Sequence, residues 1–232
     1  MSDTASSSPV LQTPLHDAHV AAGARMVDFA GWRMPVNYGS QIEEHHAVRR
    51  DAGMFDVSHM LALDLEGFDA TNWLRALLAN DVARLERSGV PGKALYSCML
   101  NGKGGVIDDL IVYRLDDQHY RIVVNAGTAV SDVAWMRPHI ATVKANVTLT
   151  ERRDLAMIAV QGPNAREKTW AALPELKAGS EALAVFSGAQ IGDFFVGRTG
   201  YTGEDGFELT LPAAKAIATW NALVEAGVRP CG

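Results

Sequence analysis

The sequence is poor in cysteine and has no long apolar run, and each shortage excludes a class of protein. The two cysteines among its 232 residues, Cys98 and Cys231, lie far apart and belong to no C-x-x-C or Cys/His cluster. A disulfide framework and a zinc site are therefore poorly supported, and a reducing compartment fits best. No run of about 18 apolar residues occurs, so the sequence predicts no membrane-spanning helix.

Basic runs are also missing, and the net charge is −6. The sequence therefore does not have the positive charge that binding of duplex nucleic acid requires. A local basic patch that binds an anionic ligand is still possible. The segment Met1–Leu11 contains neither Lys nor Arg, unlike a signal or transit peptide. We expect residues 1–11 to form a disordered tail and the protein to be cytoplasmic.

The remaining composition is that of an ordinary globular protein, with 48% hydrophobic and 21% charged residues. Ser40 and Glu43 form a capping-box pattern that predicts a helix closed by Gly53, and Pro212 predicts the first turn of another helix. Leu61 to Leu65 alternates as a half-buried strand does. Such helices and hairpin-like strand pairs alternate irregularly, which predicts an α+β fold with helices packed on mainly antiparallel sheets.

Residues 96–113 contain two adjacent carboxylates, Asp108 and Asp109, in a very apolar strand that follows a glycine-rich turn. Neighbouring strand residues point to opposite faces, so at most one of the two carboxylates can face a given pocket. One interpretation is that one Asp caps the turn and the other lies at an exposed strand end. The alternative is a carboxylate aimed into a cavity, where it holds a cationic or N–H-rich ligand.

Residues 197–208, G-R-T-G-Y-T-G-E-D-G-F-E, match neither the dinucleotide pattern G-x-G-x-x-G nor a P-loop. Tyr201 and Glu208 could offer a ring and a pair of acceptors to a flat heterocycle, such as a 2-amino-4-oxo pyrimidine ring. The alternative is an ordinary glycine-rich hairpin with Glu208 on its solvent side.

Two histidine-containing segments are weaker candidates. His59 lies close to Asp56 and Ser58, but a catalytic triad is assembled in space and no G-x-S-x-G occurs. Residues 43–46, E-E-H-H, lack the H-E-x-x-H spacing for zinc and are expected on a solvated helix face. We expect no metal site.

Taken in order, several segments resemble the glycine cleavage T protein family. They are T-P-L-H-D-A-H-V-A-A-G-A-R-M-V-D-F-A-G-W-R-M-P-V-N-Y (13–38), D-V-S-H-M (56–60), G-K-A-L-Y-S-C-M-L-N (92–101), G-G-V-I-D-D-L-I-V-Y (104–113), V-V-N-A (123–126), A-V-Q-G-P-N-A (159–165) and R-T-G-Y-T-G-E-D-G-F-E (198–208). Each is weak alone, but their order and spacing cover nearly the whole chain.

The resemblance implies an aminomethyltransferase of the glycine cleavage system, without nucleic-acid or membrane partners. In that family an aminomethyl group on the lipoyl arm of the H protein gives its carbon to tetrahydrofolate, which acts as co-substrate. The products are 5,10-methylenetetrahydrofolate, ammonia and the dihydrolipoyl H protein. By the family's motif Asp109 matches the critical carboxylate. Glu208 and Tyr201 match pterin-binding positions, Tyr96 and Asn125 match other folate contacts, and Ile111 and Tyr113 share the strand face of Asp109.

The resemblance also implies two interleaved subdomains, one from residues 12–60 and about 152–232, the other from about 61–151 and incomplete. The family continues past R-P-C-G (229–232) into an Arg-bearing stretch and a final β-barrel domain, which this sequence lacks. We therefore expect a truncated chain with weak or no folate turnover.

Two other folate-binding families are alternatives to the transferase. The related iron–sulfur maturation and repair proteins carry a K-G-C-Y-x-G-Q-E segment that is missing here. The folate domains of sarcosine and dimethylglycine oxidases follow a flavin domain, and no G-x-G-x-x-G precedes the opening block. Both differences favour the transferase.

Overall fold

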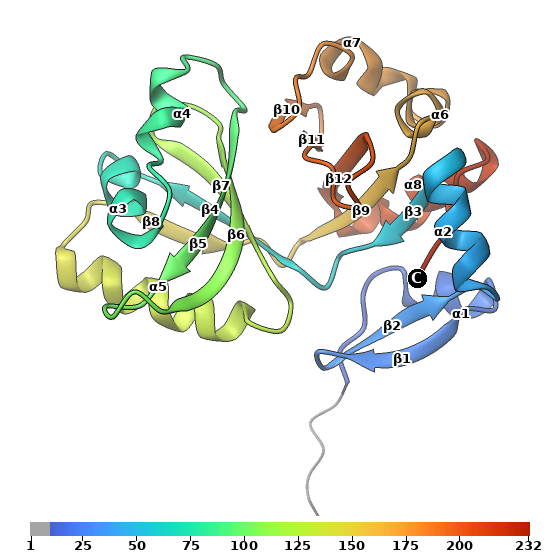
Figure 1. Ribbon diagram of the computed structural model, residues 1–232, viewed down its shortest axis with the longest axis horizontal. Coiled ribbons are helices and arrows are strands. Elements are labelled where there is room, and N and C mark those ends of the chain that lie inside the picture. Colours follow the sequence, from blue (N-terminus) through green and yellow to red (C-terminus); the bar gives the residue numbers. More distant parts are fainter. Residues whose placement is uncertain (1–9) are drawn as a thin grey trace, which may run out of the picture.

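The computed structural model describes residues 10–232, which form two lobes (Figure 1). We call residues 61–151 the insert lobe, and residues 10–60 with 152–232 the flanking lobe. All strands of the insert lobe form one five-stranded sheet, and the flanking lobe holds a six-stranded sheet and a two-stranded hairpin. This strand pairing supports our proposal that the subdomains divide near residues 60 and 152.

The sheets are antiparallel except where β3 pairs with β13, which confirms the α+β fold with mainly antiparallel sheets. The insert sheet has the order β5 (Ala94–Leu100), β6 (Val106–Arg114), β7 (His119–Val124), β4 (Leu61–Glu66), β8 (Thr148–Glu151). The flanking sheet has the order β10 (Ser187–Ile191), β11 (Phe194–Arg198), β12 (Gly206–Pro212), β9 (Leu155–Gln161), β3 (Gly53–Asp56), β13 (Arg229–Pro230), and the hairpin is β1 (Arg25–Phe29) with β2 (Trp32–Asn37).

Helices cover one face of each sheet. In the insert lobe these are α3 (Ala70–Leu77), α4 (Ala83–Arg87) and α5 (Ala129–Val143). In the flanking lobe they are α1 (His16–Ala21), α2 (Gln41–Arg50), α6 (Ala165–Ala172), α7 (Lys177–Ser180) and α8 (Ala216–Glu225), with short 3-10 turns at Pro174–Leu176 and Ala213–Lys215.

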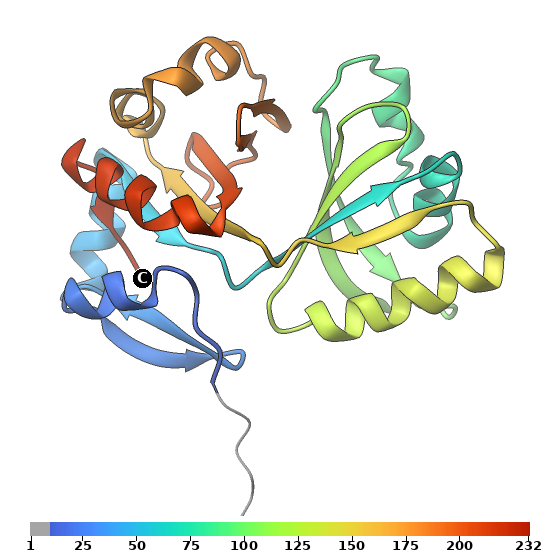
Figure 2. The same cartoon turned by 180° about the vertical axis from the view of Figure 1, so that it is seen from behind.

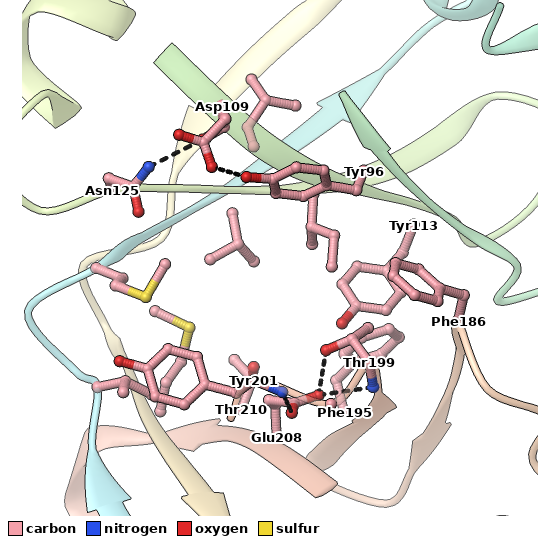
Figure 3. Close-up of a pocket in the computed structure, with 17 residues that line it drawn as sticks. Tyr96, Asp109, Tyr113, Asn125, Phe186, Phe195, Thr199, Tyr201, Glu208 and Thr210 are labelled. Atoms are coloured by element: carbon pink, nitrogen blue, oxygen red, sulfur yellow. Dashed lines mark hydrogen bonds between the residues drawn. The ribbon is translucent and has the colours of Figure 1, made fainter. Parts of the chain in front are cut away.

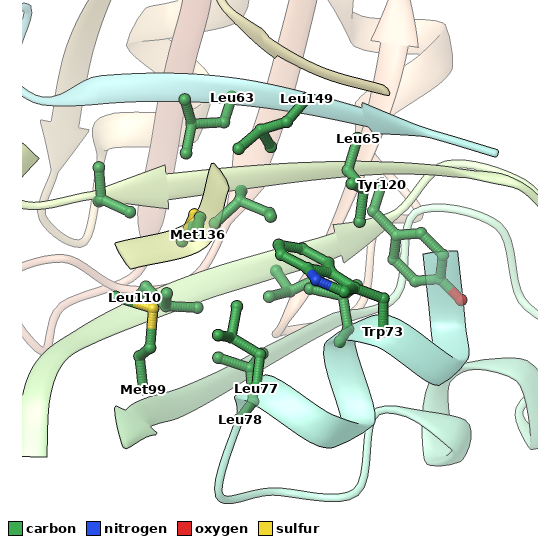
Figure 4. Close-up of a cluster of buried hydrophobic side chains, with 14 of the residues drawn as sticks. Leu63, Leu65, Trp73, Leu77, Leu78, Met99, Leu110, Tyr120, Met136 and Leu149 are labelled. Atoms are coloured by element: carbon green, nitrogen blue, oxygen red, sulfur yellow. The ribbon is translucent and has the colours of Figure 1, made fainter. Parts of the chain in front are cut away.

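The insert lobe has its own hydrophobic core between its sheet and the helices α3 and α5 (Figure 4). Trp73 of α3 and Met136 of α5 are buried there against Leu110 and Val112 of β6. Burial of large apolar side chains is the main stabilising contribution to such a core. Because strand side chains alternate, the opposite face of β6 is left for the second lobe.

The flanking core repeats this arrangement. Ile158 of β9 and Leu209 of β12 pack with Trp220 of α8 in one buried cluster. Beside it, the buried imidazole of His19 bonds to the Asp56 carboxylate at 2.9 Å. Thr13 donates to the same carboxylate oxygen at 2.6 Å, so this buried carboxylate ties the start of the chain to β3.

The lobes are joined at two places. The chain crosses between them after β3 and again before β9 (Figure 2). On another side the edges of the two sheets meet, where the amide of Gly188 donates to the carbonyl of Gly92 at 2.8 Å. A methyl group at position 92 would lie 1.7 Å from the Gly188 carbonyl oxygen, so this approach requires glycine.

Several local predictions can now be compared with the structure. Ser40 caps α2 as predicted, since its hydroxyl accepts the Glu43 amide at 3.3 Å. The prediction that Gly53 closes this helix is wrong, because α2 ends at Arg50 and Gly53 opens β3. Pro212 ends β12 and directly precedes the 3-10 turn Ala213–Lys215 that leads into α8, so the predicted helix start is one residue early.

The expectation of a solvated helix face over residues 43–46 is wrong for Glu44. This side chain is buried and accepts the backbone amide of Tyr38 at 2.6 Å. A carboxylate can be buried inside the lobe when it is hydrogen-bonded. The pattern of charged residues in the sequence does not show which carboxylates have such a partner.

The start of the chain and the membrane prediction are only partly covered by the structure. Residues 1–9 of the expected disordered tail lie outside the described residues. Leu11 is described, and its backbone donates to the Gly31 carbonyl and accepts from the Arg33 amide, both at 2.8 Å. Within residues 10–232, no helix combines the length and the apolar character that crossing a bilayer requires.

Candidate functional site

A cavity of about 490 Å³ lies between the uncovered faces of the two sheets (Figure 3). Ligand-binding cavities commonly have about 300–1,000 Å³, so a flat bicyclic ring system would fit. The cavity is lined by every site residue that the sequence suggested: Tyr96, Asp109, Ile111, Tyr113, Asn125, Tyr201 and Glu208.

Strand alternation places three of these residues, as expected. Asp109, Ile111 and Tyr113 follow one another on the cavity face of β6. Val112, between the last two, is buried in the insert core, and Asp108 bonds to Thr128 at 2.9 Å on the side of α5. The alternative that one Asp caps the turn and the other lies at an exposed strand end is therefore wrong.

Asp109 and Tyr96 form a hydrogen-bonded pair across neighbouring strands. The Tyr96 hydroxyl donates to the Asp109 carboxylate, and this bond raises the pKa of Tyr96 to about 12. Tyr96 is half exposed, with 51% of its surface accessible, so the pair lies at the opening of the cavity. A carboxylate in this position can stabilise positive charge on a bound molecule.

Glu208 lies on the opposite wall, on β12, and does not face solvent as the hairpin alternative required. Its carboxylate accepts the side-chain amide of Gln161 at 2.8 Å and the backbone amides of Thr199 at 3.0 Å and Tyr201 at 3.2 Å. The Thr199 hydroxyl is a fourth donor. Burial raises the pKa of Glu208 in spite of these bonds.

These four donors occupy the acceptor capacity of the Glu208 carboxylate. Two parallel N–H groups of a ligand could bind it only if other donors withdrew. The Gln161 amide and the Thr199 hydroxyl belong to side chains that can rotate, whereas the two backbone amides are fixed in the loop. Glu208 therefore holds the 199–201 loop in place, and with it Tyr201.

The glycine at position 197 is required by the close packing around it. A methyl group at this position would lie 2.5 Å from the Tyr113 hydroxyl and 3.5 Å from the Glu208 carboxylate. The absence of a side chain lets β11 approach the buried Tyr113 ring, which contacts Phe195 edge-on with ring centroids 4.9 Å apart.

The apolar walls contain residues that the sequence did not suggest. They include Val57, Met60, Met157, Phe186 and Phe195, together with Thr199 and Thr210. No local pattern marks them, because they face the cavity only after the two sheets have packed together. Among the lining residues the charged groups are Asp109 and Glu208, so the cavity favours a cationic or N–H-rich ligand.

The histidine segments build no catalytic or metal centre in the described chain. Asp56 bonds to His19 and Thr13 instead of His59, and the Ser58 hydroxyl donates to the Met157 carbonyl at 3.1 Å. Over residues 10–232 no three His, Cys, Asp or Glu side chains are grouped as a metal ion requires.

Comparisons with known proteins identify one family. Residues 15–232 match the family described as the GCVT N-terminal domain. An aminomethyltransferase of Bordetella petrii is 63% identical over 227 residues, covering 97% of this chain, and one of Nitrosomonas eutropha is 58% identical over 220 residues. The crystal structure of the glycine cleavage system aminomethyltransferase T from Bartonella henselae superimposes with a TM-score of 0.85 at 35% identity, covering 96% of this chain.

The chain spans about three fifths of the length of these relatives. It covers 61% of the Bordetella petrii protein and 60% of the chain in the Bartonella henselae structure.

Proposed function

We propose that this chain, which belongs to the GCVT N-terminal domain family, forms the folate-binding part of an aminomethyltransferase of the glycine cleavage system. The observation that carries the proposal is the convergence of Asp109 and Glu208, from separate sheets, on one cavity of about 490 Å³. Tetrahydrofolate would enter as co-substrate, and the second substrate would be the aminomethyl group on the lipoyl arm of the H protein. We place the reaction in the cytoplasm.

The reaction makes two bonds to one carbon and breaks two. The aminomethyl carbon loses its bond to nitrogen, which leaves as ammonia, and its bond to the lipoyl sulfur, which leaves as a thiol. The same carbon becomes bonded to two folate nitrogens, giving 5,10-methylenetetrahydrofolate. The carbon gains iminium-like positive character on the way, and a nearby carboxylate stabilises such charge.

Asp109 is the carboxylate that we assign to this role. It faces the cavity and is held by the Tyr96 hydroxyl, so its position is fixed before a substrate arrives. Fixed positioning of this kind lowers the entropic cost of bringing two reactants together. Tyr201 would hold the pterin ring on the opposite wall, and Glu208 would join it once the side chains of Gln161 and Thr199 rotate away and free two acceptor positions. Ile111, Tyr113 and Asn125 would complete the contacts. No covalent enzyme intermediate is needed, so the reaction requires no nucleophilic side chain.

Calorimetric titration with 5-formyltetrahydrofolate tests the assignment. We expect the wild type to bind, and Asp109→Ala and Glu208→Ala each to weaken binding about tenfold or more. Asp109→Ala loses a carboxylate that faces the ligand, and Glu208→Ala loses the group that holds the 199–201 loop and Tyr201. Asp17→Ala is the matched control, because the Asp17 side chain is 98% exposed and does not line the cavity. Unchanged affinity in both cavity variants would remove the basis of the proposal.

A further inference from the structure

Two carboxyl groups lie in contact behind the cavity wall. Asp132, in the first turn of α5, is completely buried, and Asp108 of β6 is 7% exposed. The Asp108 carboxylate is the charged neighbour that acts on Asp132, and no donor within residues 10–232 reaches either oxygen of the Asp132 carboxyl group. Two adjacent carboxyl groups in such surroundings cannot both be ionised, so the pair must hold a proton.

The hydrogen-bond donors around the pair show which member is ionised. Asp108 accepts the side-chain amide of Asn125 at 3.0 Å and the hydroxyl of Thr128 at 2.9 Å. The Thr128 hydroxyl lies closer to Asp108, at 2.9 Å, than to its other acceptor, the Asn125 backbone carbonyl at 3.3 Å. Neither carboxyl oxygen of Asp132 has a donor from any other described group. The proton therefore belongs to Asp132, and the neighbouring acceptor that it can reach is the Asp108 carboxylate.

The direction of both pKa shifts agrees with this assignment. Burial, and then the neighbouring Asp108, raise the pKa of Asp132 to about 7. Asp108 is also penalised by burial, but hydrogen bonds from Asn125 and Thr128 hold its pKa below the ordinary value. Within residues 10–232, Asp108 is the charged group that acts on Asp132, since the carboxylate of Asp109 points into the cavity on the other face of the strand.

The pair reaches the cavity through Asn125. The amide nitrogen of Asn125 donates one hydrogen to the Asp108 carboxylate at 3.0 Å and the other to the Asp109 backbone carbonyl at 2.9 Å. Both amide hydrogens are thus used on the strand side. The amide oxygen must then point the other way, and Figure 3 shows it directed away from Asp109. Since Asn125 lines the cavity, this oxygen is available as an acceptor.

We propose that Asp132 is a positioning residue: as a neutral acid it donates to Asp108, and the Asp108 carboxylate in turn fixes Asn125 with its amide oxygen facing the bound ligand. The ligand group that this oxygen would accept is an N–H. Only the identity of the ligand rests on the proposed function. The proton on Asp132 and the orientation of Asn125 do not.

The first test needs no ligand. The side-chain amide resonances of Asn125, assigned by their loss in Asn125→Ala, are followed by NMR between about pH 5 and 9, a range that brackets the titration of Asp132. We expect them to shift with a midpoint near 7 in the wild type. Asp132→Asn keeps a donor toward Asp108 and cannot ionise, so the same resonances should lose this transition. Asp17→Asn, on the exposed side of α1, should keep it.

The second test measures affinity for 5-formyltetrahydrofolate at about pH 6 and about pH 8.5, on either side of the Asp132 titration. Wild-type affinity should fall about tenfold at the higher pH, since one lost hydrogen bond of this kind is worth about 1–3 kcal/mol. Asp132→Asn should bind as the wild type does at the lower pH and show no such fall. Asp132→Ala, which lacks the donor, should bind weakly at both values.

Each outcome decides a different statement. Resonances of Asn125 that titrate identically in the wild type and Asp132→Asn would overturn the positioning role, as would weak binding by Asp132→Asn at both pH values. If the wild type binds no folate at either pH, the proposed function fails. The resonance titration then still decides whether Asp132 holds Asn125.

Discussion

Asp132→Asn is expected to stabilise the protein at pH 8 and to change its stability little at pH 4. The pKa of Asp132 is about 7 in the folded protein, against an ordinary value of 3.8. Between these values the folded state binds more protons than the unfolded state. The free energy of unfolding of the wild type therefore falls as the pH rises from about 4 to about 7, and this contribution is constant above that range. Asparagine cannot ionise, so the free energy of unfolding of the variant does not fall in this way as the pH rises.

The size of the effect follows from the same two pKa values. Their separation corresponds to about 4 kcal/mol, which is the most that the variant can gain. Structural relaxation around an ionised Asp132 reduces this gain, so we expect about 2–4 kcal/mol at pH 8.

Urea unfolding of both proteins at pH 4, 6 and 8, followed by circular dichroism, measures the difference. Other titrating groups are common to the two proteins and cancel. A stability difference that stays the same at all three pH values would show that Asp132 is not a buried neutral acid.

Two further predictions concern packing. Gly197→Ala places a methyl group 2.5 Å from the Tyr113 hydroxyl, so calorimetry should show at least tenfold weaker folate binding, and the overpacking should cost about 1–3 kcal/mol of stability. Gly102→Ala, which meets no atom within 4 Å, is its control, and equal effects of the two changes would contradict the packing argument. Trp73→Ala empties the centre of the insert core and should lower the free energy of unfolding in urea by about 3–5 kcal/mol. Val130→Ala, at a position that is 78% exposed, should leave it nearly unchanged.

Features determined by neighbouring residues could be predicted from the sequence. The N-cap at Ser40 depends on an amide three residues away, and the shared face of Asp109, Ile111 and Tyr113 depends on strand alternation alone. The family resemblance added Tyr96, Asn125, Tyr201 and Glu208, and the structure brings them to the same cavity.

Features determined by distant residues were missed for a physical reason. Glu208 is saturated partly by Gln161, 47 residues away, and Asp56 is paired with His19, 37 residues away. Glu44 lies in a polar stretch of the sequence, but in the fold its carboxylate accepts the amide of Gly232, 188 residues away. In each case the partner becomes a neighbour only through tertiary packing, so local sequence patterns cannot predict the pair.

The insertion of one lobe into the other has a consequence for the order in which the protein folds. β3 pairs with β9, but the whole insert lobe separates them along the chain. Closing so long a flexible loop is entropically unfavourable and slow. The first and last strands of the insert, β4 and β8, are paired in its sheet, so a folded insert already holds its two ends together. On the ribosome, the insert is complete before β9 emerges. Once the insert has folded, it acts as a short connection between β3 and β9. These two strands can then pair at a low entropic cost, and the six-stranded sheet forms after the insert lobe.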